Sequence, residues 1–424
     1  MPITVFDAIR GDVSSFLGGA EVGLVPENSI SQCSGPGITE VVSIEGSPYV
    51  FCAERKSIRF TSAEVNFCRE LITAFGGLYT GFSLEGYAAH FRTALLASIM
   101  DITVARSLRG DHSKGFWPIQ QLIQLLKGLS YQRYEGKPAT TGFIVHRGAK
   151  AKLCSMFRDR DHKLIPLSPP QIVSPSFFDN PLTYRLIDGT NQFFIANIQM
   201  QVIGALRICD HAGINSVEKL TQRELFSIVN RSGEGAFAIT VNEASEIEVL
   251  TSPAKLLVRR MGGWKIFDPD IFRSFLAGSL ETAAADDLLW TVYALSKSRH
   301  GTVILIYGRG RTELAALKKG SVGGDDPVCR TLIKMTRGQR LTDLKSSGTL
   351  LRILTSDGMT VFNKEGKLVE TGFIIDTSHV QEIITGGGRT AAASAASFFG
   401  KVIKVSQDGH VELYEDGKMI YRFG

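Results

Sequence analysis

The sequence predicts an α/β protein: a C-terminal domain with helices on a mixed sheet, preceded by an α+β region. Two patterns indicate this. After about residue 275, apolar runs of strand length alternate with helical patterns, which is typical of helices covering one sheet. Before it, helical patterns come first and period-two strand patterns follow. We therefore expect an α+β region at 1–135, a β-rich region at 136–274 and an α/β domain at 275–424.

Length and composition fit a globular protein of two or three domains. The chain has 424 residues, of which 44% are hydrophobic and 21% are charged, so it can bury a sizeable core. Its formal net charge of +5 is mild and spread along the chain. Without a basic stripe and interleaved aromatics, nucleic acid is not expected as a partner, whereas an anionic small molecule is compatible with this charge.

The cysteines and the apolar runs bear on location. None of the six cysteines forms a C-x-x-C motif or a histidine-paired metal spacing. The start of the sequence lacks a basic segment followed by a long apolar run, and no apolar run approaches the roughly 20 residues of a membrane span. These patterns predict a cytoplasmic protein with reduced thiols and no membrane partner.

The first region is expected to begin with strands. Residues 1–60 have the pattern of short strands and turns, with the pair Gly18-Gly19 marking a loop. A helix is then predicted, because Thr61 or Ser62 can cap its N-terminus and Glu64 follows closely. The pair Gly76-Gly77 is expected to end this helix.

Two further helices are predicted, at about 87–105 and 118–129, from apolar residues at helical spacing. His90 lies in the first of them. An ordinary surface or core histidine is the favoured interpretation there, with a ligand role as the alternative.

The middle region is predicted to be mainly β-structure. The segment 156–184 carries alternating charges and then several prolines, so we expect a solvated loop, with a ligand site as the less favoured alternative. Period-two patterns predict strands at 141–147, 192–196, 236–241, 246–250, 256–260 and 263–267.

The C-terminal domain is expected to open with two helical segments separated by a break at Gly278-Ser279. Its other predicted elements are a strand (302–307), a helix or loop (312–334), a helix (342–353), a strand-turn-strand (360–374), a helix (390–397), a strand (401–405) and a final hairpin turned at Asp416-Gly417.

Asp357 is the first candidate functional residue. It stands in Thr355-Ser356-Asp357-Gly358-Met359, on a predicted tight turn between an apolar run and a strand. An Asp-Gly pair alone is most often only a turn. At the end of an element, however, the carboxylate is expected to face a cleft, where it could bind a metal ion.

The second candidate is Gly386-Gly387-Gly388-Arg389-Thr390, which leads into an alanine-rich helical pattern. Three glycines can form a flexible linker. A glycine turn that opens directly into a helix is better explained as a phosphate site, because free backbone amides and the helix dipole favour an anion. Arg309 and Arg311 could also approach a phosphate, but a solvated loop is the favoured interpretation for them.

In order and spacing, these stretches resemble the diadenylate cyclase (DisA_N-type) family. Asp357-Gly358-Met359 resembles the family's Asp-Gly-Ala turn, and Gly386 to Ala391 resembles its Gly-Thr-Arg-His-Arg motif. Val405-Ser406-Gln407 resembles its Val-Ser-Glu strand end, and the strand from Gly301 to Ile306 resembles the one that lines the adenine pocket.

The resemblance implies an enzyme that condenses two ATP into cyclic di-AMP. It implies Mg²⁺ or Mn²⁺ as cofactor, with Asp357 as metal ligand, and a homodimer or higher homo-oligomer in which two ATP sites face each other. Residues upstream of 275 would then form a regulatory sensor. The implied catalytic residues are Asp357, Gly358 and Arg389, and the implied nucleotide-binding residues are Gly301, Thr302, Met359, Gly387, Gly388, Thr390 and Ser406.

The sequence departs from the family at three places. Gly387 and Gly388 stand where the family has its first Arg and its His, and Gln407 stands where an acidic residue follows the Ser. Asp408 could replace that acidic residue or simply begin a turn. An alternative is therefore a degenerate cyclase fold that binds ATP or a cyclic dinucleotide without catalysis and acts as a sensor.

Overall fold

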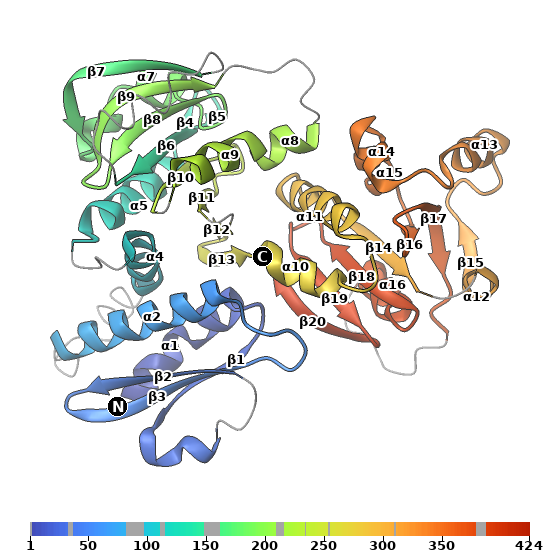
Figure 1. The fold of residues 1–424 in the computed structure, drawn as a ribbon, viewed down its shortest axis with the longest axis horizontal. Coiled ribbons are helices and arrows are strands. Elements are labelled where there is room, and N and C mark those ends of the chain that lie inside the picture. The colour runs from blue at the N-terminus through green and yellow to red at the C-terminus, as the bar shows by residue number, and fades with distance from the viewer. Residues whose placement is uncertain are drawn as a thin grey trace. The chain divides into compact units, whose positions relative to one another are not determined.

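The computed structural model describes residues 2–32, 37–81, 97–110, 115–147, 162–208, 216–233, 235–252, 255–308, 311–378 and 387–424 (Figure 1). Contacts group the chain into two compact units, one of residues 1–213 with 222–268 and the other of 214–221 with 269–424. Within the described ranges no helix is both long and apolar enough to cross a membrane. The boundaries predicted near residues 135 and 275 stay predictions.

The first unit begins with a helix, α1 (Pro2–Phe16), so the prediction of only strands and turns over 1–60 is wrong there. Phe6, Ile9, Val13 and Phe16 recur at helical spacing and are all buried. The strands that follow were predicted correctly. They form an antiparallel sheet in the order β1-β3-β2, with β1 at Glu21–Pro26, β2 at Gly37–Ile44 and β3 at Ser47–Glu54, and a 3-10 helix η1 (Glu27–Gln32) precedes β2.

Helix α2 (Ser62–Gly81) begins where the sequence predicts. The Glu64 carboxylate accepts a hydrogen bond from the Thr61 amide at 2.8 Å, and the Glu64 amide donates to the Thr61 hydroxyl at 3.4 Å. This is a reciprocal cap. The predicted end at Gly76-Gly77 is wrong, because the helix continues to Gly81. Gly76 instead allows close packing on β2, since a Cβ there would lie 2.8 Å from Val42 Cγ2.

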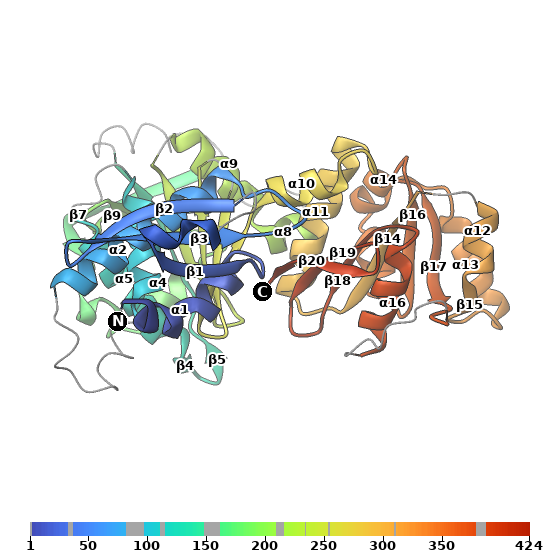
Figure 2. The ribbon, with the colours of Figure 1, turned by 90° about the horizontal axis from the view of Figure 1, so that it is seen from below.

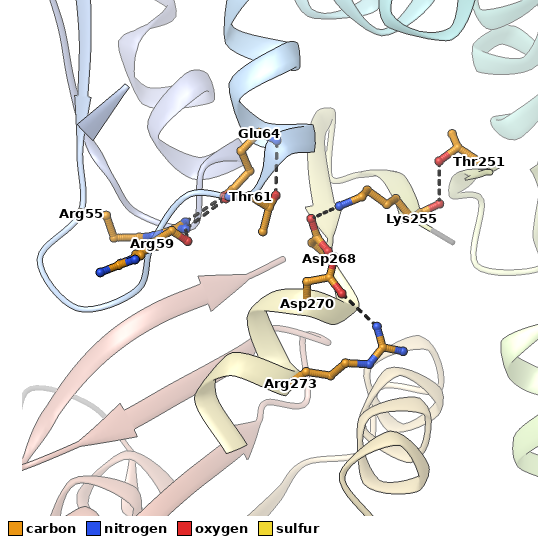
Figure 3. A network of polar contacts seen from close by, with 9 residues as sticks. All are labelled: Arg55, Arg59, Thr61, Glu64, Thr251, Lys255, Asp268, Asp270 and Arg273. Atoms are coloured by element: carbon orange, nitrogen blue, oxygen red, sulfur yellow. Dashed lines mark hydrogen bonds and ion pairs between the residues drawn. The ribbon is translucent and has the colours of Figure 1, made fainter. Parts of the chain in front are cut away.

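The start of α2 is also held by a buried ion pair (Figure 3). The Arg55 guanidinium donates to both carboxylate oxygens of Glu64, at 2.8 and 3.0 Å. It also donates to the backbone carbonyls of Leu17, Ile58 and Arg59. The side chains of Arg55 and Glu64 are only 4% and 0% exposed. Because water does not solvate these charges, each is stabilised mainly by its partner.

Glu64→Ala should therefore lower the free energy of unfolding of the first unit by about 3–5 kcal/mol, because it leaves a buried guanidinium without its carboxylate. The matched control is Arg69→Ala, which breaks the 3.0 Å ion pair between the exposed Arg69 of the same helix and Glu40 of β2. That control should cost less than about 1 kcal/mol. Equal losses for the two variants in urea denaturation would contradict a special role for the buried pair.

The rest of the first unit is a larger sheet with helices packed against it. Its strand order is β13-β12-β11-β10-β6-β8-β9-β7, parallel only between β6 and β8. The helix predicted at 118–129 is confirmed as α5 (Trp117–Ser130). Of the helix predicted at 87–105, residues 87–96, which include His90, lie outside the described residues, and α4 spans Ile99–Arg109.

All six strands predicted in the middle region are present. They are β6 (Thr141–His146), β8 (Gln192–Asn197), β10 (Phe237–Val241), β11 (Ile247–Thr251), β12 (Lys255–Arg260) and β13 (Gly263–Phe267). The sequence analysis did not predict β9 (Gln201–Ile208) or helix α9 (Arg223–Ser232), and a small hairpin joins β4 (Arg133–Tyr134) and β5 (Lys137–Pro138).

The solvated loop predicted at 156–184 is wrong in its described part. Residues 162–172 form β7 (His162–Ile172), which pairs with β9 at the edge of the sheet. An edge strand tolerates prolines, and a register shift between Pro166 and Gln171 accommodates them. A 3-10 helix η4 (Pro175–Phe178) and a short helix α7 (Leu182–Leu186) follow.

The prediction of reduced cysteines holds only in part. Cys68 and Cys329 are free thiols, whereas Cys52 on β3 is disulfide-bonded. Cys68 is fully buried, and burial, followed by the charges of Glu64 and Glu40, raises the pKa of its thiol far above the ordinary value. Such a thiol is unreactive at neutral pH. Cytoplasmic location stays a prediction.

The second unit is the predicted α/β domain with a mixed sheet. Its strand order is β15-β17-β16-β14-β18-β19-β20, with a parallel pair between β14 and β16 and antiparallel pairs elsewhere. The strands are β14 (Thr302–Tyr307), β15 (Lys318–Ser321), β16 (Met359–Asn363), β17 (Leu368–Ile375), β18 (Gly400–Val405), β19 (Val411–Glu415) and β20 (Lys418–Phe423).

Helices cover both faces of this sheet (Figure 2). Helix α16 (Gly388–Ser397) packs on β14 and β18, and its alanines share a core cluster with Val303, Leu305 and Tyr307. On the opposite face, α11 (Thr282–Lys297) packs on α10 (Pro269–Leu276), α8 (Ser216–Thr221) and α14 (Leu341–Ser346). The helix predicted at 342–353 is two helices, α14 and α15 (Thr349–Leu354), separated at Gly348, whose φ is 72°. Residues 312–334 hold α12 (Arg311–Ala316), β15 and most of α13 (Pro327–Thr336).

Candidate functional site

The candidate site lies at one edge of the second unit's sheet. In the register of the strands, Val303 stands opposite Met359 on β16, and Thr302 stands opposite Val405 on β18. The start of β14, the start of β16 and the end of β18 are therefore neighbours. This register places the turn at Asp357 and Ser406 on either side of the start of β14, although about fifty residues separate them in the sequence.

A cavity of about 630 Å³ opens at this edge. It collects most of the predicted site residues: the turn Asp357-Gly358-Met359, the segment Gly387-Gly388-Arg389-Thr390 and Ser406 all line it. The other lining residues were not named from the sequence as catalytic or nucleotide-binding residues, and they are Val303, Phe373, Ile374, Ile375, Thr377, Ala392, Lys404, Gln407 and Asp408.

Asp357 presents an exposed carboxylate at the cavity, on the turn between α15 and β16. Gly358 next to it has a φ of 87°, and a Cβ there would lie 2.6 Å from the backbone carbon of Gly372 on β17. Only glycine fits both the backbone angle and this close approach. The Asp-Gly pair thus forms a turn fixed against β17, which aims the carboxylate into the cavity opening.

The glycine segment forms the N-terminus of α16. Gly387 is its N-cap residue and provides no side-chain cap, and the first hydrogen bond inside the turn runs from the Thr390 amide to the Gly387 carbonyl at 2.9 Å. The amides of Gly388 and Arg389 precede that bond, and among the described residues they have no backbone partner, as is usual at a helix start. A Cβ at Gly387 or Gly388 would meet open space. Gly386 lies outside the described residues.

Arg389 is half-buried and packs over the backbone of Gly301. A Cβ built at Gly301 would lie 2.9 Å from Nη1 of Arg389 and 3.2 Å from Cγ of Gln407. Two residues that the sequence predicts for the same site are therefore in contact. The absence of a side chain at position 301 lets the guanidinium lie at the cavity wall.

Ser406 holds the loop that follows β18. Its hydroxyl oxygen accepts hydrogen bonds from the amides of Asp408 and His410, both at 3.2 Å. Besides this turn role, the resemblance implies that Ser406 binds the nucleotide. The two are compatible, because a serine hydroxyl that accepts two bonds can still donate its hydrogen to a ligand oxygen.

Thr302 is placed differently from the other predicted residues. Its side chain is 1% exposed and does not line the cavity. Because neighbouring residues of a strand point to opposite faces, Val303 faces the cavity and α16 while Thr302 faces the other side of the sheet. Within the described residues its hydroxyl has no hydrogen-bond partner.

Lys404 on β18 is the functional candidate that sequence reasoning missed. It lines the cavity, and its ammonium donates to the hydroxyl of Thr390 at 2.8 Å and to Glu412 at 2.7 Å. One signal in the sequence could have found it. Lys404 and Glu412 are the same number of residues before and after Asp408, which lies in the turn. This spacing predicts a cross-strand pair of opposite charges, and the two residues do pair.

A single divalent cation would find one suitable ligand at the Asp357 turn. No hydrogen bond or ion pair to the Asp357 carboxylate is found in the described part of the chain, and that part contains no cluster of three or more metal-binding side chains. Mg²⁺ is commonly held by one or two carboxylates, with substrate phosphates and water completing its shell. At this turn, Asp357 is the residue that could hold such a metal.

Comparisons with known proteins do not assign this chain to a family. No family model matches the sequence, and no curated protein matches it. Among solved structures, a double cysteine mutant of DacA from Staphylococcus aureus aligns with 32% of this chain and 84% of its own, at 17% identity and a TM-score of 0.24. A likeness at this level does not establish a fold or a function for the chain.

Proposed function

We propose that the second unit is a nucleotidyltransferase domain that condenses two ATP into cyclic di-AMP, as the resemblance of its motifs to diadenylate cyclases implies. One observation supports this most strongly. Three of the four stretches behind the resemblance, those at Asp357, Arg389 and Ser406, are far apart in the sequence but line one cavity. Motif order in the sequence does not bring these residues together, so their convergence is a separate property of the fold.

In this proposal the cavity holds the triphosphate of one ATP. The amides at the start of α16 and the Arg389 guanidinium would bind phosphate oxygens, because both favour negative charge. The Ser406 hydroxyl would donate to another phosphate oxygen. Asp357 would hold Mg²⁺ or Mn²⁺, which would polarise the α-phosphate and neutralise charge on the leaving pyrophosphate.

The chemistry needs a second copy of the domain. In each of two steps the 3′-hydroxyl of one ATP attacks the α-phosphate of the other, a 3′–5′ phosphodiester forms, and pyrophosphate and the hydroxyl proton leave. Each copy binds one ATP, so we propose a homodimer or higher homo-oligomer with facing sites. The residues upstream of about 275 would act as a sensor that controls the association of the two domains.

A second candidate function is a non-catalytic sensor of ATP or a cyclic dinucleotide. The observation that favours it is the open space beside Gly387 and Gly388, where the resembled family has an arginine and a histidine. The same cavity would then bind a nucleotide without turnover. Titration of the full chain with ATP and with cyclic di-AMP, followed by product analysis, separates the two functions.

The dimer requirement gives a prediction about concentration. Specific activity should rise with protein concentration in the dilute range, because a lone domain holds only one of the two substrates. The measurement is the initial rate of pyrophosphate release across a dilution series, with light scattering to give the oligomeric state. Constant specific activity at dilutions where only monomer scatters would contradict the facing-site mechanism.

A further inference from the structure

Lys404 is a nearly buried cation inside the candidate nucleotide cavity. It belongs to β18 and stands opposite Val303 of β14, which also lines the cavity. The residue is only 8% exposed. Burying an ammonium costs free energy unless hydrogen-bond acceptors replace the lost water. Unlike a surface lysine, Lys404 therefore depends on acceptors within the protein.

Two acceptors hold the ammonium in place. Glu412 stands directly across from Lys404 on β19 and accepts one hydrogen bond through Oε2 at 2.7 Å. Thr390, in the first turn of α16, accepts the second at 2.8 Å. An ammonium has three donors, so as far as the described residues go a third is available for a ligand or for water. Thr390 and Lys404 both line the cavity, whereas Glu412 does not.

Glu412 is itself fixed by further contacts. The Tyr414 hydroxyl donates to Oε2 at 2.7 Å, and Nε of Arg422 lies 3.8 Å from Oε1. Burial opposes ionisation of Glu412, but the hydrogen bonds from Lys404 and Tyr414 outweigh it and lower the pKa of this carboxyl. Burial and then the bond to Glu412 raise the pKa of Tyr414. The carboxylate therefore stays charged and is held by two hydrogen-bond donors and by the more distant guanidinium of Arg422.

We propose that Lys404 is the second phosphate-binding cation of this cavity, positioned by Glu412 and Thr390 beside the helix start that holds Arg389. The inference rests on the proposed function, since it names a further contact for the same nucleotide. It also explains how a site with glycine at 387 and 388 can still compensate the negative charge of a triphosphate. Arg389 and Lys404 would approach the ligand from the helix and from the sheet, respectively.

The alternative is a purely structural role, in which the Lys404–Glu412 ion pair only stabilises the β18–β19 hairpin. The two roles predict different results when the unpaired charge left by one substitution is removed by a second: stability returns in both cases, but ATP affinity returns only if the role is structural. Lys404→Met removes the charge but leaves Glu412 without its main partner, so it can weaken folding as well as binding. Adding Glu412→Gln removes the stranded carboxylate, and this double variant should recover most of the lost melting temperature.

The test uses the full chain, with ATP and adenosine as probes in isothermal titration and melting temperatures measured alongside. Both Lys404→Met and the double variant should bind ATP roughly ten- to a hundredfold more weakly than the wild type, as expected for loss of a charge-assisted contact. Adenosine binding should stay unchanged, because the lost contact is to phosphate.

Wild-type ATP affinity in the double variant would overturn the proposal, since the pair would then serve stability alone. An equal loss of ATP and adenosine affinity would also overturn it, because the damage would not be specific to phosphate. Arg389→Ala separates this failure from that of the proposed function. If Arg389→Ala loses ATP affinity while the double variant does not, only the role of Lys404 is wrong. If the wild type binds no ATP, both are wrong.

Discussion

Asp357→Asn should lower dinucleotide formation by at least about a thousandfold, because metal stabilisation of charge in the transition state is worth several kcal/mol. ATP affinity should change much less. Asparagine keeps the shape of the turn, which Gly358 and Gly372 fix, and the triphosphate contacts from α16 remain. The measurement is product formation and ATP titration on the same preparation.

Asp408→Asn is the matched control for this prediction. Asp408 also lines the cavity, but it lies in the turn that Ser406 holds. Its substitution should leave product formation near the wild-type level. If Asp408→Asn abolishes product and Asp357→Asn does not, the metal ligand has been assigned to the wrong carboxylate.

Arg389→Ala should weaken ATP binding by roughly ten- to a hundredfold, since a hydrogen bond to a charged group is worth about 1.5–3 kcal/mol. Both proposed functions require this loss, so it tests the site rather than the chemistry. Calorimetric titration with ATP is the measurement.

The control for Arg389 is Arg352→Ala, which removes an exposed arginine on α15 that does not line the cavity. It should leave ATP affinity within about twofold of the wild type, apart from weak long-range electrostatics. Equal losses for the two arginines would indicate a general effect of net charge and would contradict a specific contact at Arg389.

Local signals predicted the second unit well. The turn at Asp357, the strand 302–307, the helix start after Gly388 and the hairpin at Asp416-Gly417 all follow from apolar periodicity and turn residues, and all are present. These elements depend on short-range preferences that the sequence carries directly. The convergence of the motifs on one cavity depends on strand order instead, which local patterns do not specify.

Three failures have identifiable physical causes. The sequence gives a strand at 302–307 but not which face meets α16, so Thr302 was predicted for the site where Val303 lines the cavity. Lys404 escaped notice because its role depends on Glu412 across the hairpin and on Thr390 from another element. Helix α1 was missed because the turn glycines after it outweighed the helical spacing of its apolar residues.

The most direct test is incubation of the full chain with ATP and Mn²⁺ or Mg²⁺, with the nucleotide products identified by mass. A cyclase should yield cyclic di-AMP and two pyrophosphates for each dinucleotide, and Asp357→Asn should yield neither. ATP that remains unchanged with either metal, at protein concentrations where the chain is oligomeric, would contradict the proposed catalytic activity.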